Sequence, residues 1–178
     1  MSSIHPVVAV AQQMLLGGAV RQNHALEHAT IVLLEKKHDV RLSGVSTALG
    51  FFIFGEVPTE SIVPTAQEAL HLLRTTNPEL AINPRCGTNL AVSGVLTGLS
   101  AMAVAKMRRP YGTANNVITA STAALIMARP LGLTVQRYLT TQTPNSSMRV
   151  VKVSPVNVFN TPAHFVSTDN PDASGLFS

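Results

Sequence analysis

The sequence predicts an α+β protein that combines an amino-terminal helix, a small β-β-α-β layer and a two-helix transmembrane hairpin. Charged residues make up 12% of the chain, about half of the roughly 25% usual in soluble domains. Residues 87–105 carry no charge at all, whereas helical and alternating apolar patterns fill residues 23–83. We therefore expect three regions: residues 1–86 with the amino-terminal helices and the α+β layer, residues 87–139 with the membrane hairpin, and residues 140–178 with carboxyl-terminal strands and an extended tail.

The first predicted elements are an apolar segment and a polar-faced helix. The segment from Val7 to Val20 is too short to cross a bilayer core of about 30 Å. No Lys or Arg precedes it, so the charged start of a secretory signal is absent and we expect the segment to be retained. Asn23 is the predicted N-cap of the following helix, which ends in the cationic run KKH at residues 36–38.

The residues after this helix predict the β-β-α-β layer. The stretch VRLSGVSTALGFFIFGEV contains two short strand patterns, with residues 51–54 as the buried part of the second. Helical spacing returns in PTESIVPTAQEALHLLRTT, and ELAIN, residues 79–83, follows as a candidate strand. Near the carboxyl end, MRVVKVSPVNV and AHFVST predict two further strands before a polar tail.

Two long apolar segments predict the hairpin. Residues 87–105 have the length that a helix needs to cross hydrocarbon, and NNVITASTAALIMARPLGLTVQRYL returns after the cationic turn KMRRPYG. The positive-inside tendency places this turn in the cytoplasm. Small residues recur at every fourth position, which lets helices approach closely in lipid: Ser93, Thr97, Ala101, Ala105, Ala120, Ala124 and Ala128. A hairpin buried in a soluble core is the alternative explanation of the same pattern.

The charge distribution and the cysteine content limit the kinds of partner and ligand that fit this sequence. Residues 81–167 contain no Asp or Glu but eight Lys and Arg, so this half of the chain is purely cationic. Because aromatic residues for base stacking make up only 4% of the chain, we expect an anionic lipid bilayer as the counterpart and no nucleic acid. The single cysteine, Cys86, excludes an intramolecular disulfide and leaves a thiol that could bind a metal.

The stretch NHALEHAT places two imidazoles and a carboxylate within one and a half helical turns. His24 and His28 are four residues apart, a spacing at which both rings can reach one Zn²⁺. Glu27 beside them could accept a proton from a metal-bound water, as in the H-x-x-E-H pattern of inverted zincins. A third ligand is required, and Cys86 and Glu56 are the competing candidates.

Three other interpretations of this stretch stay open. It could be an ordinary helix start whose Glu favours the amino-terminal dipole and whose His residues form local hydrogen bonds. The site could hold a structural metal rather than a catalytic one. One His could also sit below the metal of a haem or another pigment, for which a single ligand leaves no spacing to recognise.

Four motifs together resemble a known family. NHALEHAT, GEVPTE, CGTNL and RPLGLTVQRYLTT occur in this order and are similar to an uncharacterised bacterial family, described as a domain of unknown function and frequent in phototrophic lineages. The resemblance covers nearly the whole chain and implies a membrane-associated protein, but it supplies no activity. Whether the chain is an enzyme is therefore left open at this point.

Two functions fit these observations. The first is an accessory or assembly subunit of a larger membrane complex, photosynthetic or not, in the bacterial inner or photosynthetic membrane, with other membrane-protein subunits or copies of itself as partners. The second is a membrane-bound, peptidase-like zinc hydrolase in which His24 and His28 bind zinc, Cys86 or Glu56 completes the site, and Glu27 activates water.

Overall fold

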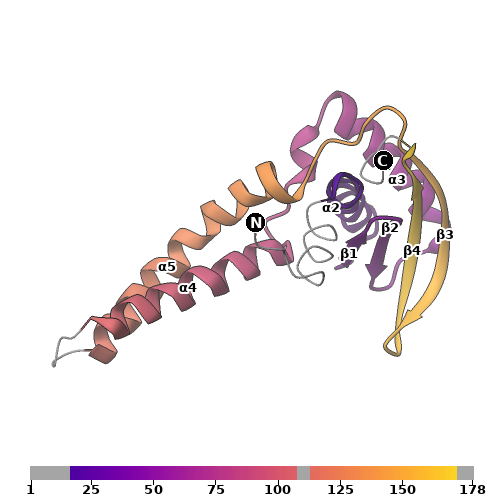
Figure 1. Cartoon of the computed structure of the whole chain (residues 1–178). Coiled ribbons are helices and arrows are strands. Elements are labelled where there is room, and N and C mark those ends of the chain that lie inside the picture. Colours follow the sequence, from indigo (N-terminus) through magenta and orange to yellow (C-terminus); the bar gives the residue numbers. More distant parts are fainter. Residues whose placement is uncertain (1–16, 108–112, 172–178) are drawn as a thin grey trace, which may run out of the picture. The chain divides into compact units, whose positions relative to one another are not determined.

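The chain forms two compact units in a computed structural model, which describes residues 17–107 and 113–171 (Figure 1). The first unit combines the chain up to Ile82 with the chain from Leu139 onward, and the second comprises Asn83–Tyr138. Helices accompany a four-stranded antiparallel sheet, so the predicted α+β class is confirmed. Most of the predicted apolar start, the tip of the cationic turn and the end of the tail lie outside the described residues.

The first unit begins with helix α2, Gly18–His38. Gly17 is its N-cap, so the helix begins before Asn23, and the predicted cap at that residue is wrong. The side chain of Asn23 instead donates to the backbone carbonyls of Thr47 and Ala48, which holds the helix to a turn of the sheet. The helix ends in the predicted cations, and Asp39 follows in the left-handed conformation with φ of 52°.

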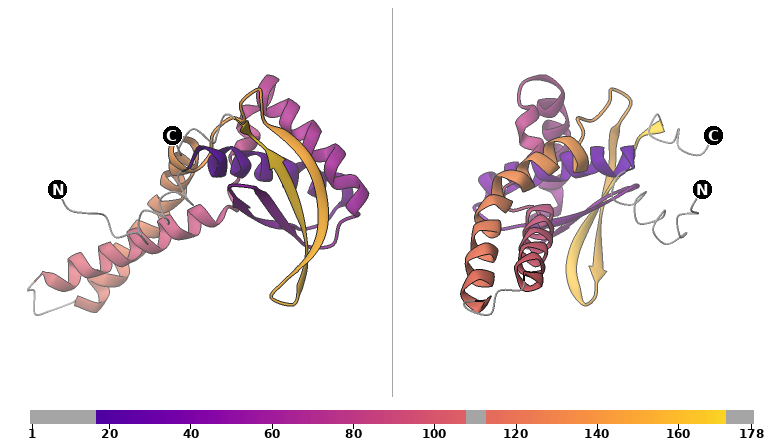
Figure 2. Two further views of the ribbon diagram at one scale, coloured as in Figure 1. Left: turned by 45° about the vertical axis from the view of Figure 1, so that its right-hand side comes forward. Right: turned by 60° about the vertical axis from the view of Figure 1, so that its left-hand side comes forward.

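The sheet of this unit has the strand order β1-β2-β4-β3. Its strands are β1 Ser43–Thr47, β2 Gly50–Phe54, β3 Arg149–Val158 and β4 Thr161–Asp169. The central pairing joins β2 to β4, with Phe51 opposite Val166. The predicted carboxyl-terminal strands therefore complete the sheet that β1 and β2 begin (Figure 2).

Helices α2 and α3 form the core with one face of the sheet. Helix α3 spans Thr59–Thr75 and buries its apolar stripe, as its helical spacing predicts. The side chains that meet in this core are fully or almost fully buried: Leu26, Leu34, Phe51, Ile53, Ile62, Leu73, Met148 and Val166. The core thus draws on both ends of the chain, and it fixes the face of α2 that points toward the sheet.

The candidate strand ELAIN is not a strand. Residues Pro78–Ala81 form a short 3-10 helix, η1, in which Leu80 N donates to Asn77 O and Ile82 N donates to Glu79 O. Pro78 favours this structure because its fixed φ suits the first position of a helix and it has no N–H to give to a sheet. The predicted β-β-α-β layer is therefore correct in its first three elements and wrong in the fourth.

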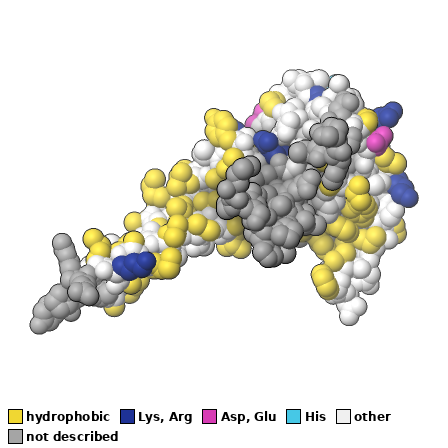
Figure 3. Space-filling view, in the orientation of Figure 1, with side chains coloured by type: hydrophobic (Ala, Val, Ile, Leu, Met, Phe, Trp, Pro, Cys, Tyr) yellow, Lys and Arg dark blue, Asp and Glu magenta, His cyan; other side chains and the backbone are white. Residues whose placement is uncertain are grey.

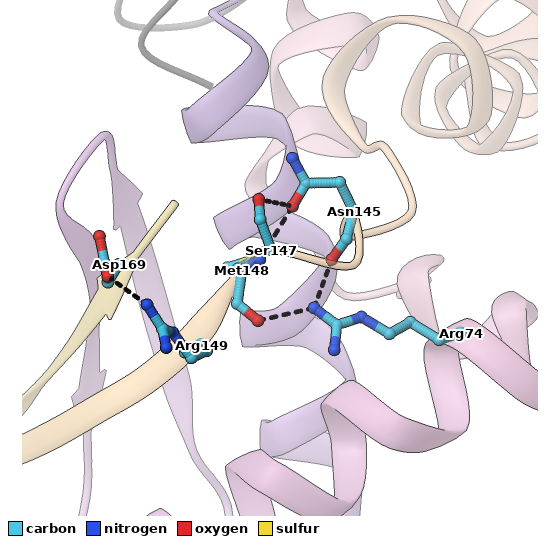
Figure 4. A network of polar contacts seen from close by, with 6 residues as sticks. All are labelled: Arg74, Asn145, Ser147, Met148, Arg149 and Asp169. Atoms are coloured by element: carbon cyan, nitrogen blue, oxygen red, sulfur yellow. Dashed lines mark hydrogen bonds and ion pairs between the residues drawn. The ribbon is translucent and has the colours of Figure 1, made fainter. Parts of the chain in front are cut away.

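Arg74, near the end of α3, fixes the segment that leads into β3 (Figure 4). Its guanidinium donates to the backbone oxygens of Asn145 and Met148, the latter at 2.7 Å. Burial lowers the pKa of Arg74. The neighbouring ion pair between Arg149 and Asp169 is 3.3 Å long and mostly exposed, so it adds little stability.

The second unit is a helical hairpin of α4, Gly87–Lys106, and α5, Thr113–Val135, which pack on each other. A π-helix, η2, continues from Gln136 to Thr140. Residues 87–106 and 114–140 are long and apolar enough to cross a membrane. Large apolar side chains point outward from both helices: Leu90, Val95, Leu99, Met102, Ile118, Leu125 and Ile126. A hairpin with this outward surface supports membrane association rather than burial in a soluble core.

Small residues line the contact between the two helices. Ser93, Thr97 and Ala101 are half-buried, and Ala128 is fully buried, as expected for a close helix–helix contact. A β-carbon at Gly132 would lie only 3.1 Å from Cα of Asn89, so glycine is required there. The GxxxG unit GVLTG faces elsewhere, because no atom lies within 4 Å of a β-carbon built at either of its glycines.

A polar cluster joins the open end of the hairpin. Gln136 is fully buried, and its amide donates to Oδ1 of Asn89 at 2.9 Å. Its oxygen accepts from the backbone N–H of Asn83, also at 2.9 Å, while Asn89 donates to Pro84 O at 2.7 Å. These bonds explain the structural role of Asn89 in CGTNL and of Gln136 in RPLGLTVQRYLTT: they close the base of the hairpin.

Candidate metal centre

The two histidines of NHALEHAT lie next to each other on α2. Their ring centroids are 4.3 Å apart in an edge-on arrangement, with the ring planes at 61°. A ring nitrogen of His24 lies within 4.8 Å of a ring nitrogen of His28. His28 is buried and His24 is half-buried. The structure therefore brings together the first two ligands that the sequence predicts.

Both imidazoles are held through the same ring nitrogen. Nδ1 of His24 lies 2.9 Å from the backbone oxygen of Thr140, and Nδ1 of His28 lies 2.7 Å from that of Ala81. A carbonyl oxygen can only accept a hydrogen bond, so each Nδ1 carries the proton. In the neutral rings the lone pair is then on Nε2, which is the form of a histidine that binds a metal through Nε2.

Glu27 points toward strand β1. Its Oε2 accepts a short hydrogen bond from the hydroxyl of Ser46. Its carboxylate also lies directly over Gly44, where a β-carbon would come 2.5 Å from Oε1. The helix thus directs His28 toward η1 and Glu27 toward β1, in agreement with their separation of about 100° around the helix axis.

Burial dominates the electrostatics of Glu27. The side chain is only 4% exposed, and desolvation raises the pKa of its carboxyl group. The hydrogen bond from Ser46 and the charge of His24 act in the opposite direction and offset part of this effect. A carboxyl group whose pKa is raised by burial binds a proton more readily than an exposed one, which is a property that a general base needs.

Glu56 lies at the other end of this layer. It follows β2, whose last residue, Phe54, pairs with Ser43. A β-carbon at the preceding Gly55 would lie 2.7 Å from the side chain of Leu42, and the backbone N–H of Leu42 donates to Glu35 of α2. Glu35 is about 16 Å along the helix from His24. Exposed Glu56 therefore lies near the carboxyl half of α2, far from the histidine pair.

Cys86 belongs to the second unit, where it is the N-cap of α4. Its Sγ accepts from the backbone N–H of Thr88 at 3.4 Å, and the residue is half-buried. The amino-terminal end of a helix favours a thiolate over a thiol, because the helix dipole stabilises the negative charge. Cys86 thus has the chemical character that a zinc ligand requires.

Comparison with known proteins gives the family. Residues 19–153 match the family described as a domain of unknown function, DUF6391. The chain belongs to this family. An uncharacterized protein of Picosynechococcus sp. is 35% identical over 167 residues, an alignment that covers 86% of this chain and 81% of that protein. No solved structure matches the chain. The resemblance inferred from the four motifs is thereby confirmed.

In this DUF6391 chain, the partners that hold the site were not predicted from the sequence. Gly44 and Ser46 give Glu27 its space and its hydrogen bond, and the carbonyls of Ala81 and Thr140 orient the two rings. One signal was present, since small residues alternate with Val45 along β1 and so leave room on one face of the strand. The carbonyl partners carry no such signal, because every residue has a carbonyl group.

Proposed function

We propose that this chain is a membrane-anchored accessory or assembly subunit of a larger membrane complex, and that its α+β unit carries a structural metal site. The anchor is the helical hairpin, whose small residues face inward and whose large apolar residues face outward. The location that we propose is a bacterial inner or photosynthetic membrane.

The observation that carries the metal site is the shared orientation of His24 and His28. Two adjacent imidazoles could be held by chance, but here both donate Nδ1–H to backbone carbonyls and so present the same kind of nitrogen. Metal-binding histidines almost always have such an outer partner, which fixes the tautomer and the ring orientation. The proposed metal is zinc, bound by both Nε2 atoms at about 2.0–2.1 Å.

Cys86 is the third ligand that we propose. It follows Ala81, the residue whose carbonyl accepts from His28, by five positions, so the chain keeps it within about 18 Å even when fully extended. Glu56 is the less suitable candidate, because the sheet holds it near the opposite end of α2. Two imidazoles and a thiolate form a donor set that zinc accepts in both structural and catalytic sites.

A zinc hydrolase is the second candidate, and the observation that favours it is the buried Glu27 with its raised pKa. The geometry favours the structural role, since this carboxylate already accepts from Ser46 and packs on Gly44 of β1. A general base must instead reach the water that the metal activates.

Metal analysis tests the proposal directly. The intact chain is purified in mild detergent, and its zinc content is compared among the wild type, His24→Gln, His28→Gln and Cys86→Ser. We expect one zinc per chain in the wild type and loss of zinc in the three variants. His71→Gln is the control, because His71 is an exposed histidine of α3 in the same unit. A wild-type protein without stoichiometric metal overturns the metal site.

Further measurements separate the remaining alternatives. If Cys86→Ser retains zinc and Glu56→Gln loses it, the third ligand is Glu56 and not Cys86. Glu27→Gln that keeps zinc but abolishes a peptidase activity of the wild type would establish the hydrolase. The complex is tested by mild-detergent purification from the native membrane, where a monodisperse monomer would contradict a subunit role.

A further inference from the structure

The sheet of the first unit has a second apolar face, opposite to the core. Strand register assigns its members, because directly paired residues point to the same side: Val45 pairs with Phe52, Phe52 with Phe165, and Phe54 with Ala163. Residues Gly44, Ser46, Phe51, Ile53 and Val166 point to the other side, where α2 and α3 lie. We call this second surface the outer face; its apolar members are Val45, Phe52, Phe54, Val156, Ala163 and Phe165, and the register places Ser43, Lys152, Ser154 and Ser167 on the same side.

Three half-buried phenylalanines form the centre of the outer face, and Lys152 is the one charged residue among these members. The ring of Phe52 lies 6.3 Å from that of Phe54 and 4.7 Å from that of Phe165, centroid to centroid. Val45 is 54% exposed. Figure 3 shows hydrophobic side chains gathered over β4. Apolar and polar residues normally alternate along the strands of an antiparallel sheet that has one face in water. A contiguous aromatic cluster on the outer face is therefore expected to be buried by another apolar surface.

No described helix of the first unit covers this face, whereas an apolar stretch of the chain precedes α2. The described chain starts at Gly17, the N-cap of α2. Asn23, less than two turns further on, bonds to the backbone of Thr47 and Ala48 in the β1–β2 turn. The amino-terminal end of α2 therefore lies near this turn at the rim of the sheet, where Leu49 is 74% exposed. From this rim the chain can pass to the outer face.

The sequence of the preceding stretch suits this surface. Residues 1–20 contain no charged side chain, and residues 4–16 include Ile4, Val7, Val8, Val10, Met14 and Leu15. Thirteen residues span about 20 Å as a helix and more when extended, whereas four strands are about 14 Å across. In either conformation the stretch is long enough to cover the sheet.

We propose that residues 4–16 of this chain dock on the outer face and form a second apolar layer across the sheet. A second copy or a lipid surface would also cover apolar side chains. The chain's own segment is favoured because it is uncharged, is covalently attached beside the rim, and needs no loss of translational freedom to bind. Its burial also removes an uncharged segment from water.

Tryptophan fluorescence provides the test, because the chain contains no tryptophan. The reporter is Phe52→Trp in the full chain, with Phe159→Trp as the matched control, since Phe159 is 99% exposed at the β3–β4 turn. Each reporter is combined with Val8→Asp and Val10→Asp, which make the segment unsuited to an apolar surface. Gln12→Asp and Gln13→Asp add the same charge at positions that are already polar.

We expect the Val→Asp pair to shift the emission of the Phe52→Trp reporter to longer wavelength and to increase its quenching by acrylamide. The Phe159→Trp reporter should not change, and circular dichroism should show that all variants keep their secondary structure. Identical emission of the Phe52→Trp reporter with and without Val8→Asp and Val10→Asp overturns the proposal. Quenching by brominated lipids would assign the face to the bilayer instead, and a dependence on protein concentration would assign it to a second copy.

Discussion

Glu27 of α2 fills the space that any side chain at position 44 would need. A β-carbon on Gly44 would lie 2.5 Å from Oε1, 2.7 Å from Cδ and 2.8 Å from Cγ of Glu27. Three atoms of one buried side chain are involved, so a small rotation of the carboxylate does not remove the overlap. The close approach of α2 to β1 therefore depends on a glycine in the strand and on the position of the carboxylate.

Gly44→Ala should destabilise the first unit by about 1–3 kcal/mol, the usual cost of overpacking a well-filled site. Combining it with Glu27→Ala should restore part of the loss, because the second change removes the atoms that overlap. Thermal unfolding in detergent measures both variants and gives the coupling between the two positions. Gly94→Ala is the control, since nothing lies within 4 Å of a β-carbon there; equal effects of the two alanine substitutions would contradict this explanation.

Most of the secondary structure could be predicted because it depends on local patterns. The helical spacing of α3 and the uncharged length of α4 are visible in a single window of sequence. The same holds for β2, where the apolar run of residues 51–54 marks the strand. These features need only neighbouring residues to be recognised.

Long-range contacts could not be predicted in the same way. The pairing of Gly50 with Ser167 joins the two ends of the chain, and no local pattern announces it. Asn23 is a residue type that is common at helix N-caps, but its side chain donates to the backbone of Thr47 because the sheet folds against α2. Likewise, the two histidines were expected from their spacing, while the carbonyls that orient them come from distant segments.

Protonation of His164 should make the stability of the first unit depend on pH. Its Nε2 lies 2.9 Å from Oγ1 of Thr59 at the start of α3, and within the described residues its buried Nδ1 has no hydrogen-bond partner. Burial lowers the pKa of His164. The folded state therefore binds the proton more weakly than the unfolded state, so this contribution to stability is complete above about pH 6.5 and is lost as the pH falls through the folded-state pKa.

The melting temperature should accordingly decrease more steeply on acidification in the wild type than in His164→Gln. His71→Gln provides the comparison, because it removes an exposed histidine from the same unit. Parallel curves for the wild type and His164→Gln between about pH 7.5 and 5 would show that His164 is not the group responsible.

Gln136→Leu should weaken the base of the hairpin by about 2 kcal/mol, because Asn83 N–H and Asn89 Oδ1 each lose a buried partner. Leucine has a similar volume, so the loss reports on hydrogen bonds rather than on packing. Gln142→Leu is the matched control, since Gln142 is exposed. Unfolding followed by circular dichroism in detergent measures the effect, and an unchanged Gln136→Leu protein would mean that water replaces the lost partners.

Leu99→Arg should impair membrane anchoring, because this residue lies near the middle of α4 and 55% of its side chain is exposed. An arginine at the centre of a membrane helix costs about 2.5–3.5 kcal/mol of insertion free energy. Met107→Arg, just beyond the end of α4 and 60% exposed, should be tolerated, since a long cationic side chain at that depth reaches the headgroups. Resistance of membrane-bound protein to carbonate extraction distinguishes the two.

The comparison between the two variants is more informative than the behaviour of either one alone. Both substitutions add one arginine at a similarly exposed apolar position, and they differ mainly in depth. If both variants stay in the membrane equally well, or if the wild type is released by carbonate, α4 does not cross the bilayer and the hairpin must be covered in another way.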